Sequence, residues 1–319
     1  MQELLDMLSY RRPAFSRHEQ KFIRRFLEPL GCRPDAFGNM ILKVGESAVL
    51  WSSHTDTVHS QSGRQEVLAT DDGFAYVPNS DCLGADCTTG VWIMMEMIRA
   101  KVPGLYIFHR AEETGGGGSS HIAAKTPHLL KGIDYAIAFD RKDVGSVITH
   151  QFGTRCASDA FAASFAAVVD LPMKADDGGT FTDTANYTDL IGECTNVSVG
   201  YYKQHTRQEY QDLEFAMALR DAMIVFDESR LVKQREAGEP DLDWSRDDYS
   251  TLNWRRAVSY TDDYGPGKDK TDKLADLERM VRYYPAAAAQ ILADYGVSAD
   301  EVLEAGCGEG DTYGRRYAA

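Results

Sequence analysis

The chain has 319 residues, 43% of them apolar, and a net charge of -15 at pH 7 from 49 acidic and 34 basic residues. This length and composition can bury a sizeable core, which excludes wholesale disorder and allows one large α/β domain or two small ones. The negative charge argues against nucleic acid or an anionic membrane as the main partner.

The N-terminal residues 1–7 hold no basic segment followed by an apolar one, so we expect no signal peptide. No apolar run approaches the length that a bilayer-spanning helix needs. The six cysteines are widely scattered, as reduced thiols are in cytoplasmic proteins, and we expect a cytoplasmic location. They are Cys32, Cys82, Cys87, Cys156, Cys194 and Cys307.

Residues 1–30 are expected to be mostly helical, because Ser16 and Glu19 form a capping-box pattern before an apolar series. Further along the chain, apolar runs of strand length alternate with amphipathic helical patterns. The expected elements are strands at 41–44 and 48–53, a hairpin over 60–78, a helix at 89–99, a strand at 105–108, a helix at 119–131, strands at 135–139 and 144–149, a helix at 157–169, a polar loop at 176–183, a strand at 196–200 and a helix at 208–228. This alternation predicts an α/β fold with a largely parallel sheet.

The composition changes near residue 230. Residues 231–270 hold few aliphatic side chains and many charges of both signs, and residues 271–305 return to a helical pattern. We therefore expect a catalytic domain at 1–229 and a C-terminal extension at 230–319. Its aromatic residues suggest that the extension packs on a surface, where it would bind a partner or cover the edge of the sheet.

Several polar side chains follow the expected strands. His54 and Asp56 share one face of an extended segment, although a structural histidine is the simpler reading of that pair alone. Asp86 comes just before a helix, where an N-cap role is the simpler reading. Glu112 and Glu113 follow the strand at 105–108, and alternation along an extended chain would point them in opposite directions.

Four apolar runs thus end near a side chain of the kind that binds metals. Sites in parallel sheets form beyond the carboxyl ends of the strands, so these groups can converge although they are distant in sequence. Imidazoles and carboxylates are ligands of zinc and similar divalent ions. The side chains at the ends of these runs are His54, Glu112 with Glu113, Asp140 and His205.

In these motifs the chain resembles the zinc-dependent exopeptidases with two co-catalytic metals, the group that includes bacterial leucyl aminopeptidase and glutamate carboxypeptidase. The shared pattern is His-x-Asp, Gly-Ala-Asp, Glu-Glu followed by glycine, an Asp at a strand end, and a distant His. All five elements occur here in that order, within residues 15–228. They are His54-Thr55-Asp56, Gly84-Ala85-Asp86, Glu112-Glu113-Thr114-Gly115-Gly116, Phe139-Asp140 and His205. The resemblance implies a three-layer α/β/α sandwich around a mostly parallel, twisted mixed sheet.

The resemblance also assigns roles to these residues. Asp86 would bridge two divalent metal ions, zinc in the first instance with cobalt or manganese as alternatives. The catalytic pair would be Glu112, the general base and acid that activates a metal-bridging water, and Asp56, which would orient His54. The remaining ligands would be His54 and Asp140 on one metal, and Glu113 and His205 on the other.

Two features bear on the branch of the family. Relatives usually carry an acid or an asparagine after Gly-Ala-Asp, whereas this chain has Cys87, which would perturb metal preference. Only 65 residues separate Asp140 from His205, and the expected elements fill that space, so we expect no inserted lid domain. Thr182 and Asp183 resemble a substrate-lining loop of relatives, and a helix N-cap is the alternative.

The leading functional hypothesis is a metal-dependent exopeptidase, more specifically an aminopeptidase because the lid is missing. One alternative is a related amidohydrolase or deacylase acting on a small N-acyl substrate. Another is a non-catalytic scaffold whose C-terminal extension binds a partner. The expected partner is a peptide or small amide substrate, with neither nucleic acid nor membrane, and the sequence gives no indication of oligomeric state.

Overall fold

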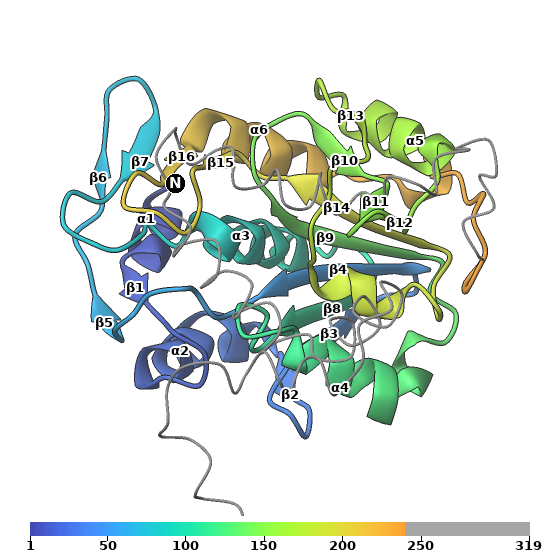
Figure 1. Ribbon diagram of the computed structural model, residues 1–319, viewed down its shortest axis with the longest axis horizontal. Coiled ribbons are helices and arrows are strands. Elements are labelled where there is room, and N and C mark those ends of the chain that lie inside the picture. The colour runs from blue at the N-terminus through green and yellow to red at the C-terminus, as the bar shows by residue number, and fades with distance from the viewer. Residues whose placement is uncertain (240–319) are drawn as a thin grey trace, which may run out of the picture. The chain divides into compact units, whose positions relative to one another are not determined.

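A computed structural model describes residues 1–239 (Figure 1). The expectations for the rest of the extension, including the helical pattern at 271–305, lie outside these residues. The helices are α1 (Gln2–Leu8), α2 (Arg17–Phe22), α3 (Ala85–Arg99), α4 (Gly117–Lys125), α5 (Asp159–Val169) and α6 (Leu213–Met223).

An eight-stranded mixed sheet is the centre of the fold. Its strands lie in the spatial order β13 (Lys174–Asp176), β10 (Ser146–Ile148), β14 (Glu193–Ser198), β9 (Tyr135–Arg141), β4 (Val49–His54), β8 (Gly104–His109), β3 (Met40–Val44) and β2 (Arg33–Pro34). The four central strands β14, β9, β4 and β8 are mutually parallel, while β3 joins β8 antiparallel and β10 joins β14 antiparallel. The expected mostly parallel mixed sheet is confirmed.

Shorter strands lie outside this sheet. The four-stranded sheet consists of β15 (Tyr201–Tyr202), β16 (Tyr210–Asp212), β7 (Phe74–Tyr76) and β6 (Leu68–Ala69), and the two-stranded pairs are β1 (Tyr10–Arg11) with β5 (Gly63–Arg64) and β11 (His150–Gln151) with β12 (Thr154–Arg155). The expected hairpin around residues 71–73 is the β6–β7 turn. Because β16 pairs with β7, the segment after His205 is tied to the segment before Asp86.

The central strands are buried on both faces, as expected of parallel strands between two helical layers. Along β4, Trp51 belongs to the core beneath α1, α3, α5 and α6, whereas its neighbour Leu50 belongs to the core beneath α4. Figure 1 shows these helices on opposite sides of the sheet. Fully burying one such apolar side chain contributes about 1.5–3 kcal/mol. The three-layer α/β/α architecture is confirmed.

The capping box at the start of α2 forms in part. Ser16 Oγ accepts a hydrogen bond from the backbone N–H of Glu19 at 3.2 Å, as predicted. The Glu19 carboxylate does not return to the backbone N–H of Ser16. It accepts from the N–H of Phe15 at 2.6 Å and pairs with the buried Arg110. The tertiary structure therefore uses Glu19 to connect α2 to the turn after β8.

The last helix is shorter than the predicted span of 208–228. α6 begins only at Leu213, because residues 210–212 are the strand β16, and Asp212 caps the helix by accepting from the N–H of Phe215 at 2.9 Å. An apolar helical pattern extends over both elements, so periodicity alone did not mark the boundary.

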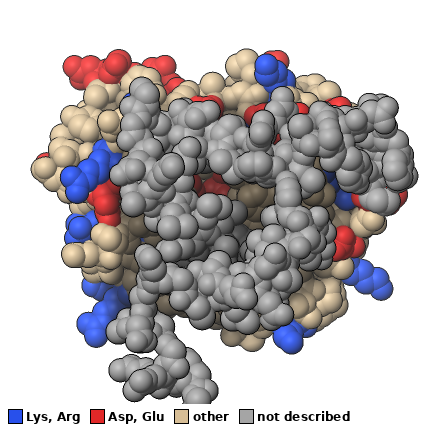
Figure 2. Space-filling model, viewed as in Figure 1, with Lys and Arg blue, Asp and Glu red and all other residues tan. Residues whose placement is uncertain are grey.

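No inserted lid domain interrupts the described chain between Asp140 and His205. That stretch holds α5, strands β10 to β15 and the 3-10 helix η4 (Asp183–Tyr187). Beyond residue 229, Leu231 is buried, and Arg235 donates to the carbonyl of Gly192 at 2.8 Å. Among residues 1–239, no helix is both long and apolar enough to cross a membrane. On the face shown in Figure 2, the described Lys and Arg side chains lie apart from one another around the edge.

Candidate metal centre

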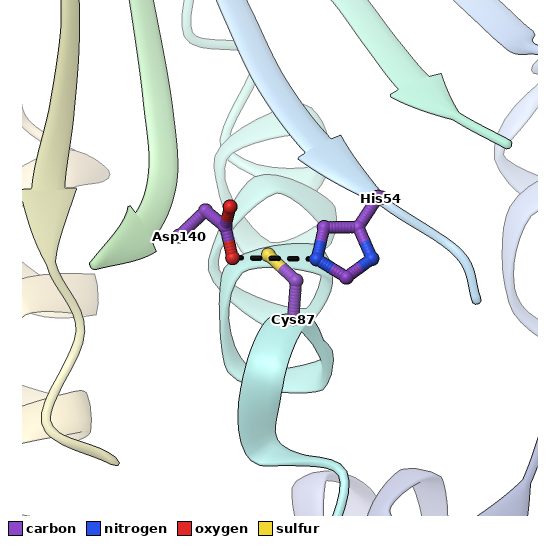
Figure 3. Close-up of side chains that lie close together, drawn as sticks. All are labelled: His54, Cys87 and Asp140. Atoms are coloured by element: carbon purple, nitrogen blue, oxygen red, sulfur yellow. Dashed lines mark ion pairs between the residues drawn. The ribbon is translucent and has the colours of Figure 1, made fainter. Parts of the chain in front are cut away.

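Two neighbouring parallel strands bring the first pair of side chains together. His54 ends β4, and Asp140 is near the end of β9, which pairs with β4 in parallel register. The His54 Nε2 atom lies 3.3 Å from Asp140 Oδ1 (Figure 3). Both side chains are almost fully buried at the carboxyl edge of the sheet, where parallel α/β sheets form their sites.

Asp86 lies between two histidines. Its Oδ1 is 3.1 Å from His54 Nε2 and its Oδ2 is 3.0 Å from His205 Nε2. The backbone at Asp86 departs from helical geometry, with ψ at 106°, although the residue lies within the first turn of α3. One carboxylate thus faces two imidazoles with different oxygens, which is the arrangement of a bridging metal ligand. The Asp86 carboxylate is hydrogen-bonded to these two imidazoles, so the N-cap reading loses its basis.

Glu113 completes the second half of the centre. Its Oε1 lies 3.2 Å from His205 Nε2, and the ligand atoms of Asp86, Glu113 and His205 all lie within 4.8 Å of one another. His205 has a left-handed backbone with φ at 62° and a side chain that is 42% exposed. Non-glycine residues adopt that conformation at some energetic cost, and such residues are often found at functional sites.

Glu112 lies beside the pair without joining either contact set closely. Its Oε2 is 4.0 Å from His54 Nε2, and its side chain is 10% exposed. Strand β8 ends at His109, so Glu112 and Glu113 occupy a turn. The expectation that alternation along a strand points them in opposite directions is therefore wrong. The turn nevertheless brings Glu113 into contact with His205, while ligand atoms of His54, Glu112 and Glu113 also lie within 4.8 Å of one another.

Asp56 holds both that turn and His54. Its carboxylate is fully buried, and its two oxygens accept hydrogen bonds from the backbone N–H groups of Glu112 and Glu113, each at 3.2 Å. His54 Nδ1 lies 3.1 Å from the Asp56 carbonyl oxygen and 3.6 Å from its Oδ1. The ring is therefore oriented mainly by the main chain, and the carboxylate positions the Glu-Glu turn.

The buried carboxylates of the cluster would be stabilised in their charged forms by a nearby cation. Burial, together with the charge of Asp86, raises the pKa of Asp140 to about 7. Burial raises the pKa of Glu112 well above its usual range, and Glu113 and Asp140 raise it further. For Asp86, burial opposes ionisation, but hydrogen bonds with His205 and His54 hold its pKa below the usual range. Buried carboxylates at such density are stabilised by cations, which favour their charged forms.

The residues fit a pair of divalent ions. Asp140 Oδ1 is buried and accepts no hydrogen bond, so it has a free lone pair facing the centre. The donor set of imidazole nitrogens and carboxylate oxygens is the one that zinc, cobalt and manganese take. His54, which contacts both Asp86 and Asp140, would hold one ion together with them. Asp86, Glu113 and His205 would hold the other.

Cys87 lies at the inner side of the first position (Figure 3). Its sulfur is within 4.8 Å of the ligand atoms of His54 and Asp140. The thiol donates to the carbonyl of Phe139 at 2.9 Å and contacts Ser53 Oγ at 2.7 Å, and burial raises its pKa well above the usual range. These contacts favour a protonated thiol that packs beneath the centre.

The two predicted substrate residues lie behind the ligands. Thr182 Oγ1 donates to Asp140 Oδ2 at 2.7 Å, and Asp183 Oδ2 lies 3.3 Å from Nδ1 of His109. Thr182 and Asp183 are each 1% exposed, so the geometry favours support of Asp140 over direct contact with a substrate. Burial raises the pKa of Asp183 to about 8.

A second group of ligand-type side chains lies elsewhere and is already hydrogen-bonded. His59, Asp81 and Cys82 are close enough together to hold an ion. However, His59 Nδ1 is 2.8 Å from the Thr57 hydroxyl and Nε2 is 3.0 Å from Gln65 Oε1. Both ring nitrogens are engaged by the protein, so this group has the contacts of a structural histidine.

Sequence reasoning missed two residues that position the centre. Asn196 exchanges two hydrogen bonds with the main chain of Asp140, both at 2.9 Å, and no local pattern marks it. Glu209 is buried and accepts from the backbone N–H groups at the start of α3. Burial raises its pKa to about 7, while the donors of Gly84 and Asp86 favour the anion. Its place four residues after His205 is the one signal that could have found it.

Comparison with known proteins gives structural matches only. No family model matches the chain, and no curated protein matches its sequence. Aminopeptidase PepT from Bacillus cereus is 14% identical with a TM-score of 0.58, and the match covers 70% of this chain and 96% of that one. A tripeptidase from Staphylococcus aureus is 14% identical with a TM-score of 0.54, and the match covers 70% of this chain and 95% of that one. The TET1 peptidase of Pyrococcus horikoshii is 14% identical with a TM-score of 0.51, and the match covers 70% of this chain and 99% of that one. That peptidase can assemble into a tetrahedron or a large octahedral shell.

This chain has the fold of these peptidases. The resemblance drawn from the five motifs is thus matched by the architecture, at an identity too low for whole-sequence comparison to detect. In this fold the five motifs meet at one edge of the sheet. Their side chains form the centre described above.

Proposed function

We propose that the chain is a metal-dependent exopeptidase that hydrolyses a peptide or amide bond, and that it acts as an aminopeptidase. The observation that carries this proposal is the position of Asp86 between His54 and His205, with Glu112 beside the pair. The aminopeptidases among the structural matches support the choice of an amino-terminal substrate. The five described cysteines are all free and buried, which supports a reducing compartment such as the cytoplasm.

Two divalent ions, when bound, would lower the pKa of a water molecule and polarise the substrate carbonyl. Glu112 then has the position of the general base, because its carboxylate lies at the edge of the ligand cluster with 10% of the side chain exposed. It accepts the proton of the attacking water and returns it to the leaving amine. Asp56 keeps Glu112 in place through the backbone of the turn, and the buried Asp140 and Thr182 keep the other wall of the centre fixed.

The test compares Glu112→Gln with wild type on aminoacyl amides and on N-acyl amino acids, each with zinc, cobalt or manganese. General acid–base groups contribute about 10²- to 10⁴-fold, so the variant should lose at least about 100-fold in kcat while retaining its metal. Glu28→Gln, at an exposed site, is the matched control and should keep full turnover.

Unchanged turnover in Glu112→Gln would refute the assignment. Hydrolysis of N-acyl amino acids alone would favour a deacylase. Purified wild-type protein without stoichiometric divalent metal at neutral pH would favour a scaffold. The panel therefore separates the proposed aminopeptidase from both alternatives.

A further inference from the structure

Glu209 is a buried carboxylate that binds main chain. It is 1% exposed, and it accepts hydrogen bonds from four consecutive backbone N–H groups. Oε2 accepts from Leu83 and Gly84, both at 2.9 Å, and Oε1 accepts from Ala85 at 2.8 Å and Asp86 at 3.3 Å. Hydrogen bonds to an ionised acceptor are roughly twice as strong as neutral ones.

These four N–H groups belong to the start of α3, where no local side chain caps the helix. The first N–H groups of a helix have no partner within the helix, so they need an outside acceptor. Gly84, at the N-cap position, has a left-handed backbone and makes no side-chain cap. Glu209 supplies the missing acceptor from a segment more than 120 residues away in the chain. The position of Asp86 therefore depends on that distant segment.

The same segment carries His205. Glu209 follows His205 by four positions, the chain between them is partly exposed, and His205 itself has a left-handed backbone. The His205 side chain contacts Asp86 and Glu113. Glu209 is therefore the buried anchor on the C-terminal side of the His205 loop, and it binds the turn that carries Asp86.

The first metal position has supports of its own. His54 is the last residue of a central strand and is 1% exposed, and Asp140 is fixed by Asn196 through two main-chain hydrogen bonds. Asp86 is shared by both positions, but neither His54 nor Asp140 contacts Glu209 in the described residues. Loss of Glu209 should consequently act on the two halves of the centre unequally.

We propose that Glu209 is a positioning residue that fixes the separation between Asp86 and His205, so that the second metal position, which needs both of these ligands, depends on it more strongly than the first, which shares only Asp86. This inference rests on the proposed metal centre, although it concerns ion binding and requires no catalysis. In Glu209→Gln the amide oxygen can still accept, but the amide nitrogen faces backbone donors. The hydrogen bonds that hold the His205 loop against the turn of Asp86 are then weakened.

The experiment is calorimetric zinc titration of the chelator-treated full chain, with metal content measured after gel filtration. Wild type should bind two ions. Glu209→Gln should bind one ion with near wild-type affinity and the second at least tenfold more weakly, as expected for loss of a group that orients a ligand. Two ions with wild-type affinities in Glu209→Gln would overturn the proposal, whether or not the protein hydrolyses any amide.

Glu193→Gln is the matched control. Glu193 is also fully buried and accepts from the backbone N–H groups of Ser158 at 2.6 Å, Gln234 at 2.8 Å and Arg235 at 2.8 Å, but it contacts no proposed ligand. It should lose stability and keep two ions, which separates positioning from general destabilisation. Loss of the second ion in Glu193→Gln as well would overturn the proposal.

Glu209→Asp covers the case in which Glu209→Gln does not fold. It keeps the charge but is one methylene shorter, so it cannot reach all four donors. One tight and one weakened ion supports the proposal, and two tight ions overturn it. Two ions bound without hydrolysis in wild type would instead refute the proposed function and leave this inference standing.

Discussion

Gly90 marks the closest approach of α3 to the sheet, and replacing it with alanine tests how that approach sets the metal centre. A Cβ at Gly90 would lie 2.0 Å from the carbonyl oxygen of Phe139, and 2.8 Å from both Cys87 Sγ and Ser53 Oγ. Ordinary contact begins near 3.4 Å, so the space is short by about 1.4 Å against a backbone atom that cannot rotate away.

The helix and the strand must then separate, and each carries a ligand. Asp86 lies four residues before Gly90 on α3, and Asp140 follows Phe139 on β9. Binding sites tolerate displacements of only about 0.5 Å. We therefore expect Gly90→Ala to lower the free energy of unfolding by about 2 kcal/mol or more, and to weaken zinc binding at least about tenfold. Without the clash, alanine within a helix would instead stabilise by about 1 kcal/mol, so the sign of the change is diagnostic.

Urea unfolding of the metal-free protein and calorimetric zinc titration measure the two effects. Gly145→Ala is the control, because the nearest atom to its Cβ would be the carbonyl oxygen of Pro172 at 3.8 Å, and its stability should stay within about 0.5 kcal/mol of wild type. A Gly90→Ala protein as stable as wild type with unchanged zinc affinity would refute the reasoning.

Two further predictions concern buried groups near the centre. Burial lowers the pKa of His109 to about 3, so its folded form stays neutral while the unfolded chain, with a pKa near 6.5, binds a proton. The contribution of His109 to the free energy of unfolding is complete above about pH 6.5 and falls by about 2 kcal/mol when the pH falls to 5. Urea unfolding at pH 7 and pH 5 should therefore show a smaller loss of stability in His109→Gln than in wild type. Equal losses in the two proteins would contradict this. The Cys87 thiol donates a hydrogen bond to the carbonyl of Phe139, so Cys87→Ala should still bind two metal ions. A sulfur-to-cobalt charge-transfer band in the cobalt-loaded wild type that vanishes in the variant would instead show that Cys87 is a ligand.

Local patterns predicted most of the elements because each depends on neighbouring residues. The apolar run before His54 became β4, and the run before Asp140 became β9, at nearly the expected bounds. The start of the last helix at Leu213 was less well predicted. The residues before it pair with β7, which is about 135 residues earlier in the sequence, and such pairing leaves no local signal.

The candidate site shows the same division. The order of motifs, through the resemblance to the exopeptidases, predicted His54, Asp86, Glu113, Asp140 and His205 as ligands, and the structure brings these side chains together at one edge of the sheet. The motifs did not identify what holds the ligands in place. Glu209 is recognisable only once the start of α3 lies against it.

The amino-acid sequence by itself determined the α/β class and the strands that carry the proposed ligands, because periodicity and side-chain type are local properties. The tertiary structure alone decided that Asp86 faces both histidines, that a turn and not a strand separates Glu112 from Glu113, and that Thr182 supports Asp140 from behind. Those features depend on distances between segments far apart in the chain, and packing of the sheet against α3 fixes them.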